Sequence, residues 1–94
     1  MRVSVIIPAL NSASTLASTV QSALGQARPA DEVVIVDDGS TDRTAEIAAS
    51  LAPPVRFFRQ ENQGAAVARN RAIAESRGEL LAFLDADDLW VPEK

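Results

Sequence analysis

Four short segments of the chain are mainly apolar, and the first two are rich in β-branched side chains. They lie at residues 2–7, 32–36, 55–59 and 79–84. Runs of this length are typical of strands that are covered on both faces of a parallel sheet, where the alternation of polar and apolar positions is lost. Pro8 has no N–H to donate to a neighbouring strand, so the pattern predicts that the first strand ends before it.

Apolar residues at helical spacing fill the intervals between these runs. They predict helices at about 14–24, 40–51 and 65–76. In the second helix, Ser40 is placed to cap the first turn and Asp42 to lie within that turn. The third helix has a face of alanines that can lie close to a sheet. Each helix is followed by a residue that stops it, namely Gly25, Pro53 and Gly78.

Strands that alternate with helices of about ten to fifteen residues indicate parallel βαβ units with right-handed crossovers. The order β-α-β-α-β-α-β therefore predicts one α/β domain over residues 1–94, with a mainly parallel sheet. Such sheets bind ligands at the carboxyl ends of their strands. Three polar clusters follow predicted strands, at residues 8–11, 37–40 and 85–88. If the strands are parallel, all three clusters meet at one edge, so a site is expected there.

Composition narrows the chemistry that this site can use. The 94 residues include 13 acidic and 9 basic ones, for a formal net charge of −4, and no cysteine or histidine. The acidic balance argues against a broad nucleic-acid-binding surface. The missing residue types exclude disulfides, zinc fingers and catalysis by cysteine or histidine within the chain. The apolar run at 3–10 is too short to span a membrane and lacks a cleavage site. We therefore expect a cytoplasmic protein, with its full-length parent at the cytoplasmic face of the membrane.

Asp85, Asp87 and Asp88 form the most acidic cluster. Alternate residues of an extended segment point to the same side, so Asp85 and Asp87 can share one ligand. Packed like charges are unfavourable unless a cation or a proton neutralises them, and hard carboxylate oxygens suit Mg²⁺ or Mn²⁺. A solvated loop that simply ends a strand explains the same residues, and the local pattern leaves both interpretations open.

The turn at 37–42 carries further candidate ligand groups. A carboxylate from Asp37 or Asp38 can accept hydrogen bonds from a nucleobase or a ribose, and Gly39 would let the backbone approach a ligand closely. An ordinary strand-to-helix turn uses the same residue types and is the simpler interpretation of this segment taken alone.

Arginine side chains can bind a diphosphate through two parallel hydrogen bonds. On the local pattern, Arg59, Arg71 and Arg77 are expected to be solvated residues. Arg69 differs from them only through the resemblance described next. Trp90 is expected to pack over the end of the sheet.

Four segments combine these features in a fixed order. They are Val3-Ser4-Val5-Ile6-Ile7-Pro8 with Asn11, Val36-Asp37-Asp38-Gly39-Ser40-Thr41-Asp42, Asn62-Gln63-Gly64 with Ala68-Arg69-Asn70, and Phe83-Leu84-Asp85-Ala86-Asp87-Asp88. Together they resemble glycosyltransferase family 2 over essentially the whole chain, and their order and spacing are more specific than any single motif. The tail at 89–94 is similar to the family's continuation after its aspartate motif.

The resemblance implies a GT-A fold, a Rossmann-like three-layer α/β sandwich with a mainly parallel sheet. It also implies a UDP-, GDP- or dTDP-sugar as donor, with Mn²⁺ or Mg²⁺ as cofactor. The family's base-contacting acid corresponds to Asp38, with Asp37 and Gly39 beside it. Pro8 and Ala9 would border the base.

The family's aspartate motif corresponds to Asp85-Ala86-Asp87. Asp85 would lie near the ribose or the sugar, and Asp87 would bind the metal, with Asp88 as the alternative ligand. Arg69 is implied for the diphosphate. The implied nucleotide-sugar-binding residues are Pro8, Ala9, Asn11, Asp37, Asp38, Gly39, Arg69, Asp85, Ala86 and Asp87, and the implied metal ligands are Asp87 and Asp88.

The family's reaction is inverting transfer, in which an acceptor hydroxyl displaces the nucleoside diphosphate in one step. A general base must take the acceptor's proton, and in the family that base lies in the following half of the domain. We therefore assign no catalytic residue within 1–94 and expect the isolated chain to be inactive. The following half would bind the acceptor, a glycan, a lipid or another hydroxyl compound. An open edge at the fourth strand favours self-association.

Two other classes of protein are alternatives. A non-catalytic module that binds a nucleotide or a partner protein would use the same fold. A receiver-like regulatory domain also has acidic strand ends, but it needs a lysine at a later strand end, and lysine occurs here at Lys94.

Overall fold

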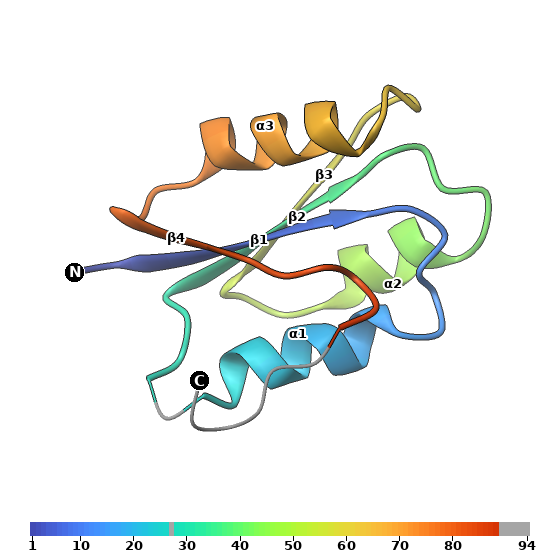
Figure 1. Ribbon diagram of the computed structural model, residues 1–94. Helices are drawn as coiled ribbons and strands as arrows, with labels where there is room; N and C mark the ends of the chain where they lie inside the picture. Colours follow the sequence, from blue (N-terminus) through green and yellow to red (C-terminus); the bar gives the residue numbers. More distant parts are fainter. Residues whose placement is uncertain (27, 89–94) are drawn as a thin grey trace.

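The computed structural model describes residues 1–26 and 28–88 and contains every strand and helix that the hydrophobic pattern predicts (Figure 1). The expectations for Trp90 and for the tail at 89–94 lie outside the described residues. In chain order the elements are β1 (Val3–Ala9), α1 (Leu16–Leu24), β2 (Glu32–Asp37), α2 (Thr44–Ser50), β3 (Val55–Arg59), α3 (Ala65–Glu75) and β4 (Leu80–Phe83).

The strands form one sheet in the order β3-β2-β1-β4, and each neighbouring pair is parallel. Figure 1 shows α1 and α2 on one face of this sheet and α3 on the other. The core on the first face includes Val5 and Leu16, and the core on the second face includes Ile6 and Ala68. The predicted three-layer α/β sandwich is therefore confirmed.

The two central strands are covered on both sides. All six residues of β2 are buried, and neighbouring residues of β1 such as Val5 and Ile6 enter opposite cores. Burial of one Val, Ile or Leu side chain stabilises a fold by about 1.5–3 kcal/mol. The central strands therefore hold the sheet together and fix where their carboxyl ends lie.

Pro8 lies inside β1, which corrects the expectation that it follows the strand. The carbonyl of Ile6 accepts the N–H of Leu84, and the carbonyl of Ala9 accepts the N–H of Asp38. Alternate residues of a strand bond to alternate sides, so the nitrogen of Pro8 faces the β4 side, beyond the end of that strand. The missing N–H therefore removes no hydrogen bond between β1 and β2.

The start of α2 also differs from the prediction. The helix begins at Thr44, so Ser40 and Asp42 both precede it. The carboxylate of Asp42 accepts the Thr44 N–H at 2.9 Å. The Ser40 hydroxyl donates to Asp37 and accepts the N–H of Asn11 at 2.8 Å. The helix starts later than predicted because these side chains bond to neighbouring loops, which a local helical pattern does not reveal.

A buried polar cluster joins the amino ends of the strands. Glu32 is 5% exposed, and its carboxylate accepts hydrogen bonds from the Ser4 hydroxyl, the Arg77 N–H and the Arg56 guanidinium at 2.6, 2.6 and 3.0 Å. A Cβ on Gly78 would lie 2.5 Å from the Ser4 hydroxyl oxygen. The chain can therefore enter β4 here only with a residue that has no side chain.

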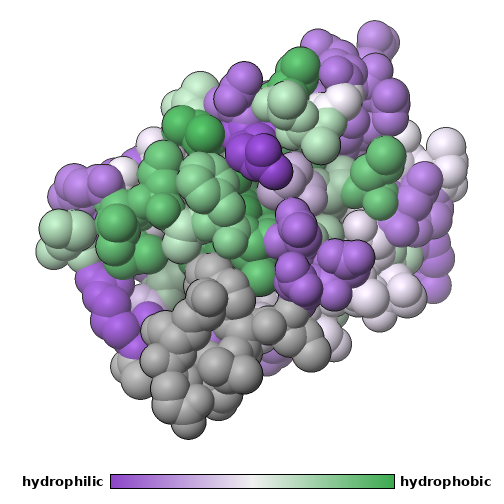
Figure 2. All heavy atoms as spheres, viewed as in Figure 1, coloured by the Kyte–Doolittle hydropathy of each residue, from purple (hydrophilic) through white to green (hydrophobic). Residues whose placement is uncertain are grey.

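β3 and β4 are the two edges of the described sheet. Leu80 and Phe83 of β4 are each 51% exposed, and Figure 2 shows apolar residues, in green, gathered on this side of the surface. Within residues 1–26 and 28–88, no helix has both the length and the apolar character needed to cross a bilayer.

Candidate functional site

The carboxyl ends of β1, β2 and β4 border one cleft of about 400 Å³. The loop after β1, the first residue after β2, the start of α3 and the segment after β4 all contribute to it. The lining residues are Pro8, Ala9, Leu10, Asn11, Ser12, Ser14, Thr15, Asp38, Ala65, Ala68, Arg69, Asp85, Ala86 and Asp87. The three polar clusters thus meet at one edge of the sheet, as its parallel topology requires.

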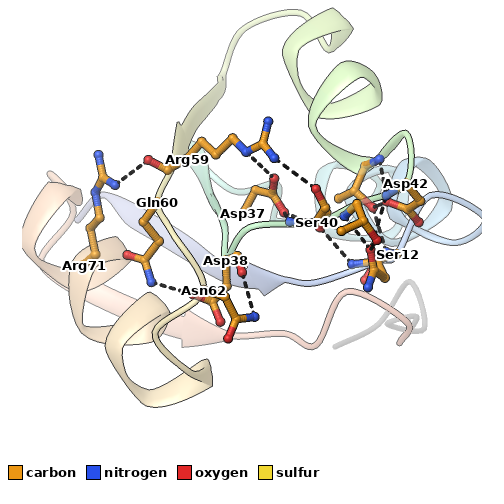
Figure 3. A network of polar contacts seen from close by, with 12 residues as sticks. Ser12, Asp37, Asp38, Ser40, Asp42, Arg59, Gln60, Asn62 and Arg71 are labelled. Atoms are coloured by element: carbon orange, nitrogen blue, oxygen red, sulfur yellow. Dashed lines mark hydrogen bonds and ion pairs between the residues drawn. The ribbon is translucent and has the colours of Figure 1, made fainter.

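Asp38 stands at the end of β2 with its carboxylate held by the loop before α3. One oxygen accepts hydrogen bonds from the Gln60 side chain at 2.9 Å and the Gln63 N–H at 2.8 Å, and the other accepts the Gly64 N–H at 3.0 Å. The Asn62 side chain donates to the Asp38 carbonyl (Figure 3). These donors fix the orientation of the carboxylate. A carboxylate has about four acceptor positions, so one remains for a ligand.

The hydrogen bonds also decide the charge of Asp38. Burial by itself raises the pKa of this carboxyl group, but the hydrogen bonds from Gln60, Gln63 and Gly64 outweigh it and bring the pKa below its ordinary value. Asp38 is therefore ionised at neutral pH and acts as an acceptor only. The importance of Gln60 and Gln63 was not predicted from the sequence, although the 62–64 segment belongs to the resemblance.

Asp37 is fully buried and does not line the cleft. One carboxylate oxygen accepts hydrogen bonds from the hydroxyl and N–H of Ser40, and the other lies 3.3 Å from Nε of Arg59 (Figure 3). Gly39 has a φ of 83°, and a Cβ there would lie 2.8 Å from the backbone nitrogen of Asn62. The close approach that Gly39 permits is thus to the chain's own backbone.

Arg59 is 55% exposed, as expected of a solvated residue, and Arg71 is partly buried, but both also bond to the protein. Arg59 donates a hydrogen bond to the Ser40 carbonyl at 2.9 Å, besides its ion pair with Asp37. Arg71 donates to the Arg59 carbonyl at 2.7 Å, and its guanidinium lies 5.5 Å from the centre of the Phe58 ring. Both arginines therefore bind the protein itself, because the fold brings carbonyls and a ring within their reach.

Asn11 joins the loop after β1 to the loop after β2. Its backbone has a φ of 49°, a left-handed conformation that asparagine adopts more readily than most residues. Its side-chain oxygen accepts the N–H groups of Thr41 and Asp42 at 2.9 and 3.3 Å, and its own N–H donates to Ser40. Asn11 lines the cleft and at the same time sets the shape of the cleft wall.

The segment at 85–88, called the acidic turn below, exposes its three aspartates to solvent. Leu84 and Ala86 are buried, whereas Asp85, Asp87 and Asp88 are exposed. The segment is not extended as the sequence argument assumed, because the N–H of Asp88 bonds to the carbonyl of Asp85 and closes a turn. The turn still gathers the carboxylates, since one oxygen from each of the three lies within 4.8 Å of the others.

This donor set fits a hard divalent cation. Carboxylate oxygens are the ligands that Mg²⁺ and Mn²⁺ prefer. In the part of the chain that the structure describes, no arginine forms an ion pair with the acidic turn. The three negative charges repel one another, and a bound cation would relieve that repulsion.

Two threonines contact the backbone of the acidic turn, namely Thr15, which directly precedes α1, and Thr19, which lies within it. The Thr15 hydroxyl lies 2.8 Å from the carbonyl oxygen of Ala86, and the Thr19 hydroxyl lies 2.9 and 2.7 Å from the carbonyl oxygens of Ala86 and Asp88. The sequence argument missed these residues because they are 67 to 71 positions away from their partners. Their spacing of one helical turn is the only local sign that they share a face.

Arg69 is the cationic residue of the cleft. It projects from α3 with an exposed side chain, and its guanidinium lies 6.0 Å from the centre of the Phe83 ring on β4. A cation above an aromatic face is stabilised by about 0.5–1 kcal/mol at an exposed position. The cleft therefore combines an oriented acceptor at Asp38, a cation at Arg69 and a cluster of carboxylates at the acidic turn.

Comparisons of this chain with known proteins point to one family. The profile described as Glycosyl transferase family 2 matches residues 4–94. The chain is 47% identical over 96 residues to the succinoglycan biosynthesis protein ExoU of Rhizobium meliloti, which covers 96% of this chain and 27% of that protein. It is 44% identical over 98 residues to an uncharacterized glycosyltransferase of Nostoc sp., which covers 100% of this chain and 30% of that protein.

A solved structure shares the fold. The crystal structure of S. aureus TarS in complex with UDP has a TM-score of 0.87 and 33% identity to this chain, and the match covers 99% of this chain and 29% of that one. The structure of TarS with UDP-GlcNAc gives a TM-score of 0.82, and the match covers 95% and 27%. The chain spans less than a third of the length of each of these proteins. Because the family profile matches nearly all of it, the chain belongs to glycosyl transferase family 2.

Proposed function

We propose that this chain is the donor-binding part of an inverting glycosyltransferase and that it binds a nucleotide-diphospho-sugar together with Mn²⁺ or Mg²⁺. The observation that carries the proposal is the single cleft in which Asp38, Arg69 and the acidic turn meet. A nucleotide-diphospho-sugar presents matching groups in one molecule, since it has N–H and hydroxyl donors at one end and a charged diphosphate beside its sugar.

Asp38 is assigned to the base or the ribose, because its ionised carboxylate is held by the loop before α3 and keeps an acceptor position free. Pro8 and Ala9, which line the cleft from β1, are assigned to the border of the base. Arg69 is assigned to the diphosphate, because a guanidinium matches the geometry of phosphate oxygens.

Asn11, Asp37 and Gly39 shape the cleft wall in this proposal. Asn11 holds the loops after β1 and β2 together. Asp37 and Gly39 shape the turn that presents Asp38. Substitution of Asp37 or Gly39 would therefore disturb the cleft through the backbone, whereas substitution of Asn11 would also change the cleft lining.

At the acidic turn, Asp85 is assigned to the ribose or the sugar, and Asp87, with Asp88 as the alternative, to the metal. Ala86, which lies between them in sequence and is buried, also lines the cleft. A divalent metal held by these carboxylates would offset the charge that develops on the departing nucleoside diphosphate. The residues of this chain would orient the donor for attack by an acceptor hydroxyl, and the base that takes the acceptor's proton is assigned to another part of the protein.

The donor, the acceptor and the cell compartment belong to the same proposal. Uridine donors are the first to test, because TarS was solved with UDP and with UDP-GlcNAc, and GDP- and dTDP-sugars are the alternatives. The acceptor would be a glycan, a lipid or another hydroxyl compound bound outside this chain. The small share of the relatives' length that this chain covers supports that assignment. We propose a cytoplasmic location, at the cytoplasmic face of the membrane for the full-length parent.

Calorimetric titration of the chain with UDP, GDP and dTDP tests the proposal. One nucleotide is expected to bind at least about ten times more tightly with Mn²⁺ than with EDTA, which corresponds to about 1.4 kcal/mol. If the chain binds none of the three nucleotides, either with Mn²⁺ or with EDTA, the result contradicts donor binding. Nucleotide binding that is equal in EDTA contradicts the metal assignment and favours the alternative of a non-catalytic nucleotide-binding module.

The open edge at β4 supports a further expectation for the isolated chain. In the sheet that the described residues form, β4 is an edge strand, and an edge strand with Leu80 and Phe83 half exposed presents both backbone hydrogen-bonding groups and apolar surface. We expect the weight-average sedimentation coefficient to rise with protein concentration, and less so for Phe83→Lys. A chain that sediments as a monomer at millimolar concentration contradicts self-association.

A further inference from the structure

We infer that Thr15 and Thr19 are positioning residues for the metal site and hold the acidic turn in its cation-binding shape. The inference rests on the proposed function, because it concerns the ion assigned to the three aspartates. It adds two neutral residues, one directly before α1 and one within it, that contact neither the ion nor the donor's reacting atoms in that assignment. Their contacts are with the backbone of the turn.

The donors and acceptors match in number. Each hydroxyl has one hydrogen to donate, and two carbonyl oxygens of the turn lie within reach. The shortest pairing gives Thr19 to Asp88 at 2.7 Å and Thr15 to Ala86 at 2.8 Å. In this pairing both carbonyls are satisfied, whereas a turn without the threonines would leave the buried Ala86 carbonyl without these donors.

Thr19 is buried at a position from which its hydroxyl reaches the acidic turn. Its side chain is fully buried, and a buried hydroxyl is unfavourable unless it makes a hydrogen bond. In a helix, a threonine hydroxyl commonly bonds to the carbonyl one turn earlier. Here it reaches the acidic turn, 67 and 69 positions away in sequence.

Neutral donors suit a turn that must remain available to a cation. An arginine or lysine in the same place would fix the turn as well, but its charge would compete with the ion for the carboxylates. The hydroxyls bind the backbone carbonyls on either side of Asp87 and leave its carboxylate exposed. They therefore keep three like charges within 4.8 Å of one another without neutralising them.

Thr19→Val tests the inference, since valine keeps the branched shape and removes the hydroxyl. Titration of Mn²⁺ alone, followed by the electron paramagnetic resonance signal of the free ion, is expected to show affinity about 10- to 100-fold weaker than for the wild-type chain, as for other residues that orient metal ligands. Thr19→Ser, which restores the hydroxyl, is expected to recover most of the affinity. Ser18→Ala, an exposed position on the same helix, is expected to leave it unchanged.

Thermal unfolding in EDTA separates positioning from general stability. If Thr19→Val lowers the melting temperature but binds Mn²⁺ as the wild-type chain does, the hydroxyl is merely structural and the inference is wrong. The less buried Thr15→Val provides the same comparison if Thr19→Val does not fold, and equal Mn²⁺ affinity in that variant also overturns the inference. A wild-type chain that binds no Mn²⁺ overturns the metal assignment itself and the inference with it.

Discussion

Asp87→Asn is expected to weaken binding of UDP in the presence of Mn²⁺ by on the order of 100-fold, because loss of a residue that merely orients a metal ligand already costs about 10- to 100-fold. Asp87 is exposed, and its carboxylate belongs to a cluster of like charges. Removal of one of these charges relieves repulsion, so the free energy of unfolding without metal should stay the same or rise. Calorimetry with and without Mn²⁺ and urea unfolding measure the two effects.

Two further variants make this result specific. Glu61→Gln removes one negative charge from an exposed position outside the cleft and is expected to leave the affinity unchanged. Asp88→Asn compares the two candidate ligands directly, and the variant with the greater loss identifies the residue that binds the ion. If Asp87→Asn and Asp88→Asn both bind UDP as tightly as the wild-type chain with Mn²⁺, the acidic turn is not the metal site.

Glu32→Gln is expected to lower the free energy of unfolding by about 3–5 kcal/mol, which is the usual effect of removing one partner from a buried ion pair. Glu32 accepts hydrogen bonds from Ser4, Arg56 and the N–H of Arg77, so it joins β1, β2, β3 and the entry to β4. A small domain has about 5–15 kcal/mol of stability in total. The variant should therefore show a clearly lower urea midpoint.

The pH dependence of stability gives a second measurement on the same residue. Burial by itself raises the pKa of Glu32, but the hydrogen bonds from Ser4, Arg77 and Arg56 lower it below its ordinary value. The contribution of Glu32 is therefore fully present above the pKa of the unfolded chain and is lost as the pH falls through the lower pKa of the folded chain, below about pH 4. Glu32→Gln should lose less stability than the wild-type chain in that range.

The exposed pair of Arg43 and Glu46 provides the control. Its side chains are 77% and 67% exposed, and solvent screens such pairs almost completely. Glu46→Gln is expected to leave the urea midpoint unchanged. If Glu32→Gln behaves like Glu46→Gln, the buried cluster does not hold the amino ends of the strands together.

The sequence predicts the order of elements well because each strand is a short, mainly apolar run between helices with apolar faces. It fails where the deciding contact is distant. The effect of Pro8 depends on which neighbour its nitrogen faces, and that follows from the end of β4. The start of α2 depends on bonds that Ser40 and Asn11 make between loops.

The same limit applies to the candidate site. Asp38 and the acidic turn could be predicted, because acids at the carboxyl ends of parallel strands converge and because the segments resemble a known family. The sequence did not distinguish Asp37, which turns into the core, from Asp38, which lines the cleft. The spacing of Thr15 and Thr19 indicates a shared face but not their partner, because a hydroxyl on a helix has many potential partners and only the fold selects the distant turn.

The attachment of β4 has a consequence for the order in which the molecule assembles. Among the described strands, β4 pairs with β1 alone, over four residues, and the acidic turn follows it. The sheet of β1, β2 and β3 can form before β4 arrives, but the cleft cannot. A ligand that touches both Asp38 and the acidic turn would therefore stabilise the last strand to join, by about 2.7 kcal/mol at a concentration of one hundred times its Kd. The concentration of the donor in the cell would then determine how often β4 detaches from β1.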